Sequence, residues 1–306
     1  IMGSFIALAV GAWYLKKNRH IDFAMKTVRV ATVCAIVTTG VMLVTAHSSA
    51  VTVAEEQPTK LAMMEGAYET ESMPLYAFGW VDEETQQVIT PFSIPGGTSF
   101  LATGDFSAEY QGLNDLAESG VYGDAFTAET VENLPVNAVF QSYHLMVAMF
   151  GLIALTTILA LIFTYRGGRI KNMKWLQWLC IVSPLFPFFA IQGGWFTAEV
   201  GRQPWVVYPA ESSPAGVSLE VGDAYSQSVT GPEVALTIVL FVVVYLFLII
   251  GWARIVAHQI KKGPEMSASE AQLMGFDASA TKAVAAAGVA GGGAAAGTTI
   301  AGKDGE

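Results

Sequence analysis

The chain has 306 residues, of which 53% are hydrophobic and 14% are charged, and its formal net charge is −10. So apolar a chain is not an ordinary soluble protein, and its acidic balance argues against a nucleic-acid partner. Its two cysteines lack the spacing of a metal site, which argues against a zinc-binding module.

Five apolar segments are predicted to cross a membrane. They are a short one at residues 1–15, followed by 28–46, 138–165, 175–195 and 232–252. A crossing helix needs about 20 apolar residues, so the first segment is slightly short. Because a span must satisfy its backbone hydrogen bonds internally and no barrel pattern is present, we expect an all-α integral membrane protein.

The basic residues orient these spans. Residues 16–29, 166–174 and 254–262 hold five, four and three Lys and Arg. Five spans bring all three clusters to one face, which the positive-inside rule makes cytoplasmic. Residues 47–137 fall on the opposite face and hold fifteen Asp and Glu but only one basic residue, Lys60. We therefore expect a long extracytoplasmic loop there, and loops of this length are usually functional.

These signals divide the chain into four parts. Residues 1–46 are predicted to form a transmembrane hairpin whose first helix is incomplete at its N-terminal end, and residues 47–137 form the loop. Residues 138–262 hold three transmembrane helices. Residues 263–306 are rich in Ala and Gly without a period, which predicts a disordered cytoplasmic tail.

Lys60 and Glu65 are the first candidate site residues along the chain. They are five residues apart, within reach of each other if the segment is helical. An ammonium and a carboxylate that tune each other's pKa would suit a site that binds hydroxyl groups and accepts their protons. A solvated ion pair on an amphipathic helix is the commoner explanation of this spacing.

Met146 and His144 lie at the outer start of the segment 138–165. A Met in an apolar helix is ordinarily a core residue, although its thioether can also ligate haem iron. Two residues correspond to about 200° around a helix, so the two side chains are expected to face opposite ways.

Residues 194–205 read Gly-Trp-Phe-Thr-Ala-Glu-Val-Gly-Arg-Gln-Pro-Trp. Pro204 disfavours helical geometry at the residue before it, so the helix is predicted to end near Arg202. Glu199 then lies near a helix C-terminus, where the helix dipole disfavours its charge and it needs a cation: Arg202 or a metal ion. Trp195 precedes it by one turn on the same face. The residues alone slightly favour an interfacial salt bridge flanked by aromatic side chains.

Three segments together resemble subunit I of the cytochrome bd quinol oxidases. They are residues 194–205 with their Gly-Arg-Gln-Pro-Trp signature, the loop segment 57–70 and the helix start 140–147. The resemblance runs over roughly residues 3–262 and looks like the second half of that subunit. It implies a haem-binding helical bundle in the cytoplasmic membrane of a bacterium or archaeon. Such an enzyme oxidises quinol at the outer face, reduces dioxygen to water and contributes to the proton motive force.

The resemblance also implies roles for individual residues. Lys60 and Glu65 would bind quinol and serve its oxidation. Met146 would be an axial ligand of a low-spin haem b. Glu199 would be an axial ligand of a high-spin haem b and belong to the catalytic group, with Arg202 as its electrostatic partner beside the haem.

Two further side chains belong to this expected set. Trp195 would pack against the haems as part of the catalytic group. His144 stands where the family pattern has Arg. It would contact a haem propionate, replace the charge of that Arg, or be a satisfied neutral histidine.

The resemblance further implies cofactors and partners. Two haems b and a haem d are expected, with quinol as substrate, and the family's histidine ligands lie before the point where this chain starts. The expected partners are a chain or segment carrying the N-terminal half of subunit I, subunit II of the oxidase, a small accessory single-helix subunit, and membrane lipid. A haem-free membrane assembly or transporter subunit on the same scaffold is the alternative.

Overall fold

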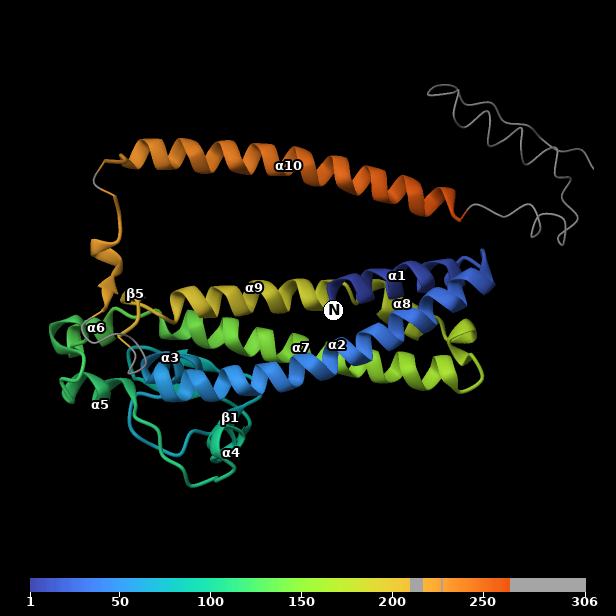
Figure 1. The fold of residues 1–306 in the computed structure, drawn as a ribbon. Coiled ribbons are helices and arrows are strands. Elements are labelled where there is room, and N and C mark those ends of the chain that lie inside the picture. The colour runs from blue at the N-terminus through green and yellow to red at the C-terminus, as the bar shows by residue number, and fades with distance from the viewer. Residues whose placement is uncertain (210–216, 227, 265–306) are drawn as a thin grey trace, which may run out of the picture. The chain divides into compact units, whose positions relative to one another are not determined.

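The computed structural model describes residues 1–209, 217–226 and 228–264 of the chain (Figure 1). The tail predicted at residues 263–306 therefore lies outside the described residues from 265 onward.

Apolar helices dominate the described part of the chain. Four spans are long and apolar enough to cross a membrane: α2 (Ile21–Glu56), α7 (Val136–Tyr165), Lys174–Val200, and α10 (Gly231–Lys262). The third span consists of α8 (Lys174–Val182) and α9 (Leu185–Val200), which meet near Pro184. Proline lacks the backbone N–H that a continuous helix needs, which accounts for the break. The shorter apolar helix α1 (Met2–Lys16) completes the predicted set, and the all-α membrane fold is confirmed.

The helix α2 runs farther than its apolar segment. The predicted span ended at residue 46, whereas α2 continues to Glu56. The first proline after residue 46 is Pro58, and the residue before it, Gln57, leaves the helical region at φ −138°. Residues 47–56, in which polar and apolar side chains are mixed, thus extend the helix beyond the apolar span, because they contain no proline or glycine that would break it.

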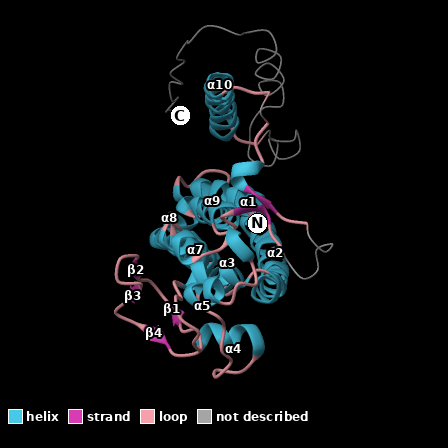
Figure 2. Ribbon diagram, turned by 90° about the vertical axis from the view of Figure 1, so that its left-hand side faces the viewer, coloured by secondary structure: helices cyan, strands magenta, loops and turns pink. Residues whose placement is uncertain are grey.

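The helix α7 lies at the centre of the bundle. It packs against α9, α2, α3 and α8, and the view along the helices shows it surrounded by them (Figure 2). The helix α1 packs against α2 and α8. This packing is close: a Cβ added at Gly11 of α1 would lie 2.7 Å from Val28 Cγ2 of α2. By contrast, no described residue of α10 is buried.

Residues 57–135, here called the loop region, are folded. Their elements are α3 (Pro58–Glu65), β1 (Leu75–Tyr76), β2 (Trp80–Asp82), β3 (Gln87–Ile89), β4 (Ser93–Ile94), α4 (Gly97–Thr103), α5 (Leu113–Glu118), η1 (Gly123–Ala125) and α6 (Ala128–Glu132). The strands form two small antiparallel sheets, β1 with β4 and β2 with β3.

The core of the loop region is closed by residues from outside it. Phe140 and Val139 of α7 belong to the same buried cluster as Met63 and Leu113 of the loop region. Trp205, which follows α9 and starts β5 (Trp205–Val207), belongs to it too and is 2% exposed. The strand β5 pairs with β6 (Leu219–Glu220), which runs into the short helix η3 (Val221–Asp223). A further short helix, η2 (Arg169–Asn172), connects α7 to α8.

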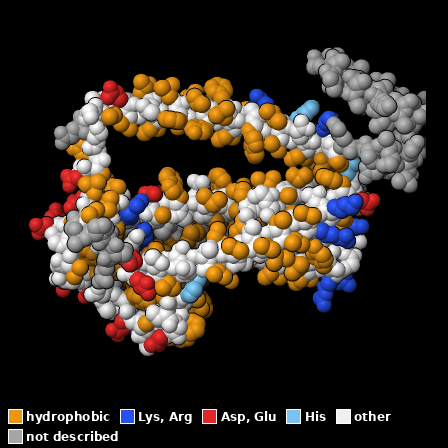
Figure 3. Space-filling view, viewed as in Figure 1, with side chains coloured by type: hydrophobic (Ala, Val, Ile, Leu, Met, Phe, Trp, Pro, Cys, Tyr) orange, Lys and Arg blue, Asp and Glu red, His pale blue; other side chains and the backbone are white. Residues whose placement is uncertain are grey.

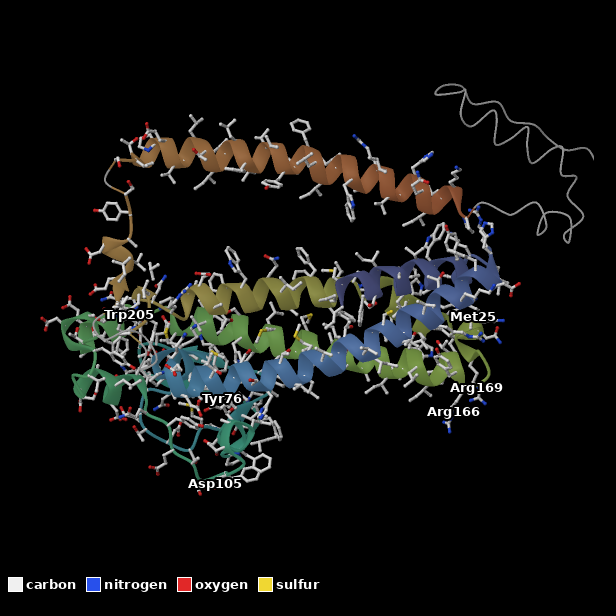
Figure 4. The ribbon with its side chains drawn as sticks, in the orientation of Figure 1. Met25, Tyr76, Asp105, Arg166, Arg169 and Trp205 are labelled. Carbon is white, nitrogen blue, oxygen red and sulfur yellow. The ribbon has the colours of Figure 1, made fainter. Side chains whose placement is uncertain are left out.

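The charges divide between the two ends of the bundle. Figure 3 shows Lys and Arg gathered where α1 turns into α2, Asp and Glu over the loop region, and hydrophobic side chains between them. Arg166 and Arg169 lie at the first end, and Tyr76 and Trp205 lie at the other (Figure 4). This polarity is what the sequence predicts.

Candidate functional site

The C-terminal end of α9 carries an ion pair. The helix ends at Val200, and Arg202 Nη2 donates a hydrogen bond to Glu199 Oε2 at 2.5 Å. The side chains are 52% and 31% exposed for Glu199 and Arg202. The second carboxylate oxygen, Oε1, accepts no hydrogen bond from the described residues. Trp195, one turn earlier, is 63% exposed. The predicted helix end and salt bridge are confirmed, and the carboxylate keeps one oxygen free for a further partner.

Lys60 lies against this same end of α9. It is 8% exposed, and a Cβ added at Gly201 would lie 3.3 Å from Lys60 Cγ, so its stem covers the cap of the helix. Burial and the neighbouring Arg202 guanidinium lower the pKa of Lys60, whereas the Glu199 carboxylate raises it. Two cations and one carboxylate are thus grouped where α3 meets α9.

The predicted pairing of Lys60 with Glu65 is wrong. Both belong to α3, but five residues correspond to about 140° around a helix, so the two side chains point apart. The pKa of each is shifted by other neighbours, and both side chains are buried. A solvated ion pair between Lys60 and Glu65 is therefore excluded. The expectation that each residue shifts the pKa of the other is wrong as well.

Glu65 occupies a separate buried site in the loop region. It is 1% exposed, and neither carboxylate oxygen has a hydrogen-bond partner among the described residues. Burial raises the pKa of Glu65 to about 8. The hydroxyl groups of Thr98 and Tyr143 lie beside the carboxyl and oppose this shift, although they do not reach hydrogen-bond geometry. Glu65 is thus a neutral acid near pH 7 that can exchange a proton slightly above it.

His144 points from α7 toward the loop region. Its Nδ1 lies 2.8 Å from the carbonyl oxygen of Phe140, so Nδ1 carries the hydrogen, because a carbonyl only accepts. The ring stacks on Phe140 at 3.9 Å between centroids, with Tyr143 and Tyr76 farther out. Its Nε2 is buried and has no hydrogen-bond partner among the described residues. Only one of the two ring nitrogens of His144 therefore has a hydrogen-bond partner among the described residues.

Met146 points the other way, as predicted, and lies against α9. A Cβ added at Gly194 would lie 2.8 Å from Met146 Sδ. Next to it, a Cβ at Gly193 would lie 2.8 Å from the carbonyl oxygen of Ser142. The Gly193-Gly194 pair is the sequence signal for this contact, because small residues at helix interfaces in membranes let the helices pack closely.

The two candidate iron ligands belong to different sides of α9. Met146 touches α9 at Gly193 and Gly194, and Glu199 follows five to six residues later. That separation corresponds to about half a turn of rotation and about 8 Å along the axis. The arrangement fits two separate prosthetic groups and not one shared group.

An aromatic cluster beside Lys60 was also missed. Thr59 donates a hydrogen bond to Tyr208 OH at 3.0 Å, and Tyr208 OH donates one to Tyr122 OH at 3.0 Å. Trp205 packs on Tyr208 and Phe126 with ring centroids at 4.9 and 5.6 Å. Burial raises the pKa of Tyr208, which keeps its phenol neutral. Trp205 and Tyr208, the aromatic residues that follow Pro204, are the only sequence signal for this aromatic cluster.

The donor set fits haem iron supplied with further ligands from elsewhere. Within residues 1–209, 217–226 and 228–264, no group of three or more His, Cys, Asp and Glu could hold a metal ion. The candidate ligands are instead the thioether of Met146 and the carboxylate of Glu199, which lie on different sides of α9. Thioethers and carboxylates each serve as single axial ligands of iron, which requires no cluster.

The chain is similar in sequence to known subunits of terminal oxidases. A family model described as cytochrome bd terminal oxidase subunit I matches residues 1–264. The chain is 27% identical over 267 residues to cytochrome bd ubiquinol oxidase subunit 1 of Bacillus subtilis (strain 168), covering 86% of this chain and 54% of the relative. It is 25% identical over 325 residues to cytochrome bd-II ubiquinol oxidase subunit 1 of Escherichia coli (strain K12), covering 88% and 61%.

A solved structure shares the fold. The bd oxidase from Geobacillus thermodenitrificans matches with a TM-score of 0.67 at 24% identity, covering 86% of this chain and 55% of the matched chain. The chain thus spans about half the length of the relatives that it matches.

Proposed function

Since the chain belongs to the cytochrome bd terminal oxidase subunit I family, we propose that it is part of a membrane-bound quinol oxidase that reduces dioxygen to water. In this proposal it contributes the loop that binds quinol and one axial ligand to each of two haems b. The matched residues cover 54% and 61% of the two relatives, and the proposed activity also involves the remaining part of subunit I.

The observation that carries the proposal is the contact of Lys60 with the end of α9. The lysine stem lies over Gly201, and its ammonium is close enough to Glu199 and Arg202 for their charges to shift its pKa. Lys60, the candidate quinol-binding residue, and Glu199, the candidate haem ligand, thus lie in the same cluster of charged side chains. A short distance between donor and acceptor is what electron transfer from quinol to a haem requires.

Each residue has a proposed role in this arrangement. Lys60 places a positive charge beside the quinol hydroxyls and favours the ionised quinol. Glu65 accepts a proton when it is ionised, and its raised pKa of about 8 lets it then hold that proton near neutral pH. Arg202 neutralises Glu199, and the exposed ring of Trp195 offers a packing surface for a haem. When bound, the haems carry the electrons and bind dioxygen.

The proposed cofactors are a low-spin haem b at Met146, a high-spin haem b at Glu199, and a haem d whose histidine ligand lies outside this chain. The buried Nε2 of His144, which has no hydrogen-bond partner among the described residues, suits a contact with a haem propionate. The proposed partners are the segment with the N-terminal half of subunit I, subunit II, a small accessory single-helix subunit and membrane lipid.

The protein is a multi-pass membrane protein, and we place it in the bacterial or archaeal cytoplasmic membrane. The loop region is assigned to the extracytoplasmic side and the C-terminal tail to the cytoplasm. The Lys and Arg where α1 turns into α2, together with Arg166 and Arg169, lie at the opposite end of the helices from the loop region. The number of spans in the sequence assigns the basic residues 254–262 to the same, cytoplasmic side. Protons released from quinol at Glu65 would then leave on the outer side and contribute to the proton motive force.

An optical spectrum of the complex purified from native membranes tests this function. A Soret band, bands of both low-spin and high-spin haem b, and oxygen uptake driven by added quinol are the expected result. A complex without a Soret band would instead be the haem-free assembly or transporter subunit.

Replacement of Lys60 with alanine should raise the apparent KM for quinol or lower turnover by about 10-fold or more while haem content stays unchanged, because a single charged hydrogen bond contributes about 1.5–3 kcal/mol. Quinol-driven oxygen uptake and the haem spectrum measure the two effects. Lys171→Ala, a change of the same kind at the other end of the bundle, serves as control. Unaltered quinol kinetics in Lys60→Ala would remove Lys60 from the site.

Replacement of Met146 with leucine preserves the side-chain volume but removes the sulfur. The low-spin haem b signal should weaken, or its midpoint potential should fall, because thioether ligation raises the potential of haem iron. Redox titration of the purified complex measures both. Leu145→Met, next to Met146 on an exposed part of α7, tests for nonspecific effects. A Met146→Leu complex with an unchanged redox spectrum excludes Met146 as a ligand.

A further inference from the structure

The thioether of Met146 lies in a gap that a glycine leaves open on α9. A Cβ added at Gly194 would lie 2.8 Å from Met146 Sδ and 3.7 Å from Met146 Cγ. The first distance is too short for any Cβ to occupy without displacement of the sulfur. Among the described residues outside α9, only Met146 comes within 4 Å of that position. The side chain at residue 194 therefore decides where the sulfur can be.

The distance between the two helices at this point is fixed independently. A Cβ at Gly193 would lie 2.8 Å from the Ser142 carbonyl oxygen, so the backbones of α7 and α9 already touch. The hydroxyl groups of Ser142 and Thr197 hydrogen-bond across the interface at 2.8 Å. The backbone of α9 at Gly194 is therefore held at a fixed distance from the sulfur. For α7 to move away, the Ser142–Thr197 hydrogen bond and the backbone contact at Gly193 would have to break.

From this contact we infer that Gly194 is a positioning residue for the sulfur of Met146. The Met side chain has three rotatable bonds, so its own backbone does not fix the sulfur. The bare backbone of α9 at Gly194 lets the sulfur lie flat against the helix, and that location is its iron-binding location. The inference rests on the proposed ligation of the low-spin haem b by Met146. It adds the requirement that residue 194 must lack a side chain.

Alanine substitutions at the two neighbouring glycines, Gly193 and Gly194, should have different effects. Gly193→Ala would meet the backbone oxygen of Ser142, which cannot yield, so it should separate the helices and reduce the amount of assembled complex. Gly194→Ala would meet only the end of a flexible side chain. It should leave assembly intact and displace the sulfur.

The test compares variants of the complete complex purified from native membranes. Gly194→Ala, Met146→Leu and Gly151→Ala are measured by reduced-minus-oxidised spectra, by redox titration and by carbon monoxide binding to the reduced enzyme. Gly151 lies on α7 with nothing within 4 Å of its added Cβ, so it controls for glycine replacement in a helix. Carbon monoxide binds the low-spin haem only after an axial ligand has been lost, so this readout does not depend on turnover.

The expected result is that Gly194→Ala loses part of the low-spin haem absorbance, lowers its midpoint potential and gains carbon monoxide binding at that haem. Met146→Leu shows the same changes more fully, and Gly151→Ala shows none. If Met146→Leu changes the spectrum but Gly194→Ala does not, the positioning role is overturned and the ligation stands. If Met146→Leu leaves the spectrum unchanged, the ligation fails and the positioning role fails with it.

A failure of Gly194→Ala to assemble is resolved by a second variant. The double variant Gly194→Ala with Met146→Ala has no sulfur for the new methyl group to displace. Recovery of assembly in the double variant shows that the methyl acted on the Met146 side chain, which supports the inference. A double variant that still fails to assemble shows that the methyl acts on helix packing, which overturns it.

Discussion

Glu199→Ala should abolish the high-spin haem b signal and most oxygen reduction while the low-spin haem b remains. A carboxylate is a weak-field ligand, as a high-spin iron requires. In addition, Glu199 lies at a helix C-terminus, where its charge is disfavoured without a cation. Its Oε1 has no hydrogen-bond donor among the described residues, so an oxygen remains for iron. Spectra of the reduced complex and quinol-driven oxygen uptake measure the two losses.

Arg202→Gln separates iron ligation from the ion pair. This variant breaks the pair with Glu199 but retains the carboxylate. An exposed ion pair contributes about 0–1 kcal/mol to stability, which is too little to explain the loss of a haem. Glu199→Ala should therefore be far more severe than Arg202→Gln. If both variants keep full haem content and normal oxygen uptake, Glu199 is only a salt-bridge partner.

Glu65→Gln should lower quinol oxidation by about 100-fold or more, the usual contribution of a positioned general base. In the native chain burial raises the pKa of Glu65 to about 8, so its ionised fraction grows as the pH rises toward and beyond that value. Because a proton acceptor must be ionised, quinol oxidation by the native enzyme should increase with pH across this range. The variant should lose this dependence. Initial rates of quinol oxidation between pH 6 and pH 9 measure it.

Glu84→Gln is the matched control for this experiment. It makes the same chemical change at an exposed carboxylate in the turn between β2 and β3. Stability gives a second readout with a defined sign. The raised pKa of Glu65 means that the folded chain binds more protons than the unfolded chain between about pH 4.5 and 8, so its contribution favours folding at the acid end and is lost as the pH rises. Glu65→Gln should remove this trend, and an unchanged pH profile of both rate and stability would contradict the assignment.

Much of the membrane fold could be predicted because crossing a bilayer imposes a long apolar pattern. The segment predicted at 138–165 corresponds to α7 at Val136–Tyr165. The end of α2 was missed because its polar continuation to Glu56 is helical without being apolar. The internal structure of the loop region was missed as well, since its short helices and strands depend on a core that is completed by other parts of the chain.

The sequence predicted the individual residues of the candidate site, but it did not predict which of their side chains contact one another. Sequence spacing suggested that Lys60 belongs with Glu65, whereas helical rotation separates the two and brings Lys60 to the end of α9. The contact of Met146 with Gly194 depends on the register between α7 and α9. No local pattern in either helix encodes that register.

The shared core of the loop region has a consequence for the order of biosynthesis. Leu61 and Met63 are made long before Trp205, although they belong to the same buried cluster. At a synthesis rate of about 5–20 residues per second, the chain from residue 135 to residue 205 takes roughly 4–14 s to appear. During this interval the loop region is already outside the span of α2 but lacks the tryptophan that closes it. Its folding is therefore completed only after α9 has been inserted, which leaves a nascent apolar surface that translocation factors or lipid must cover.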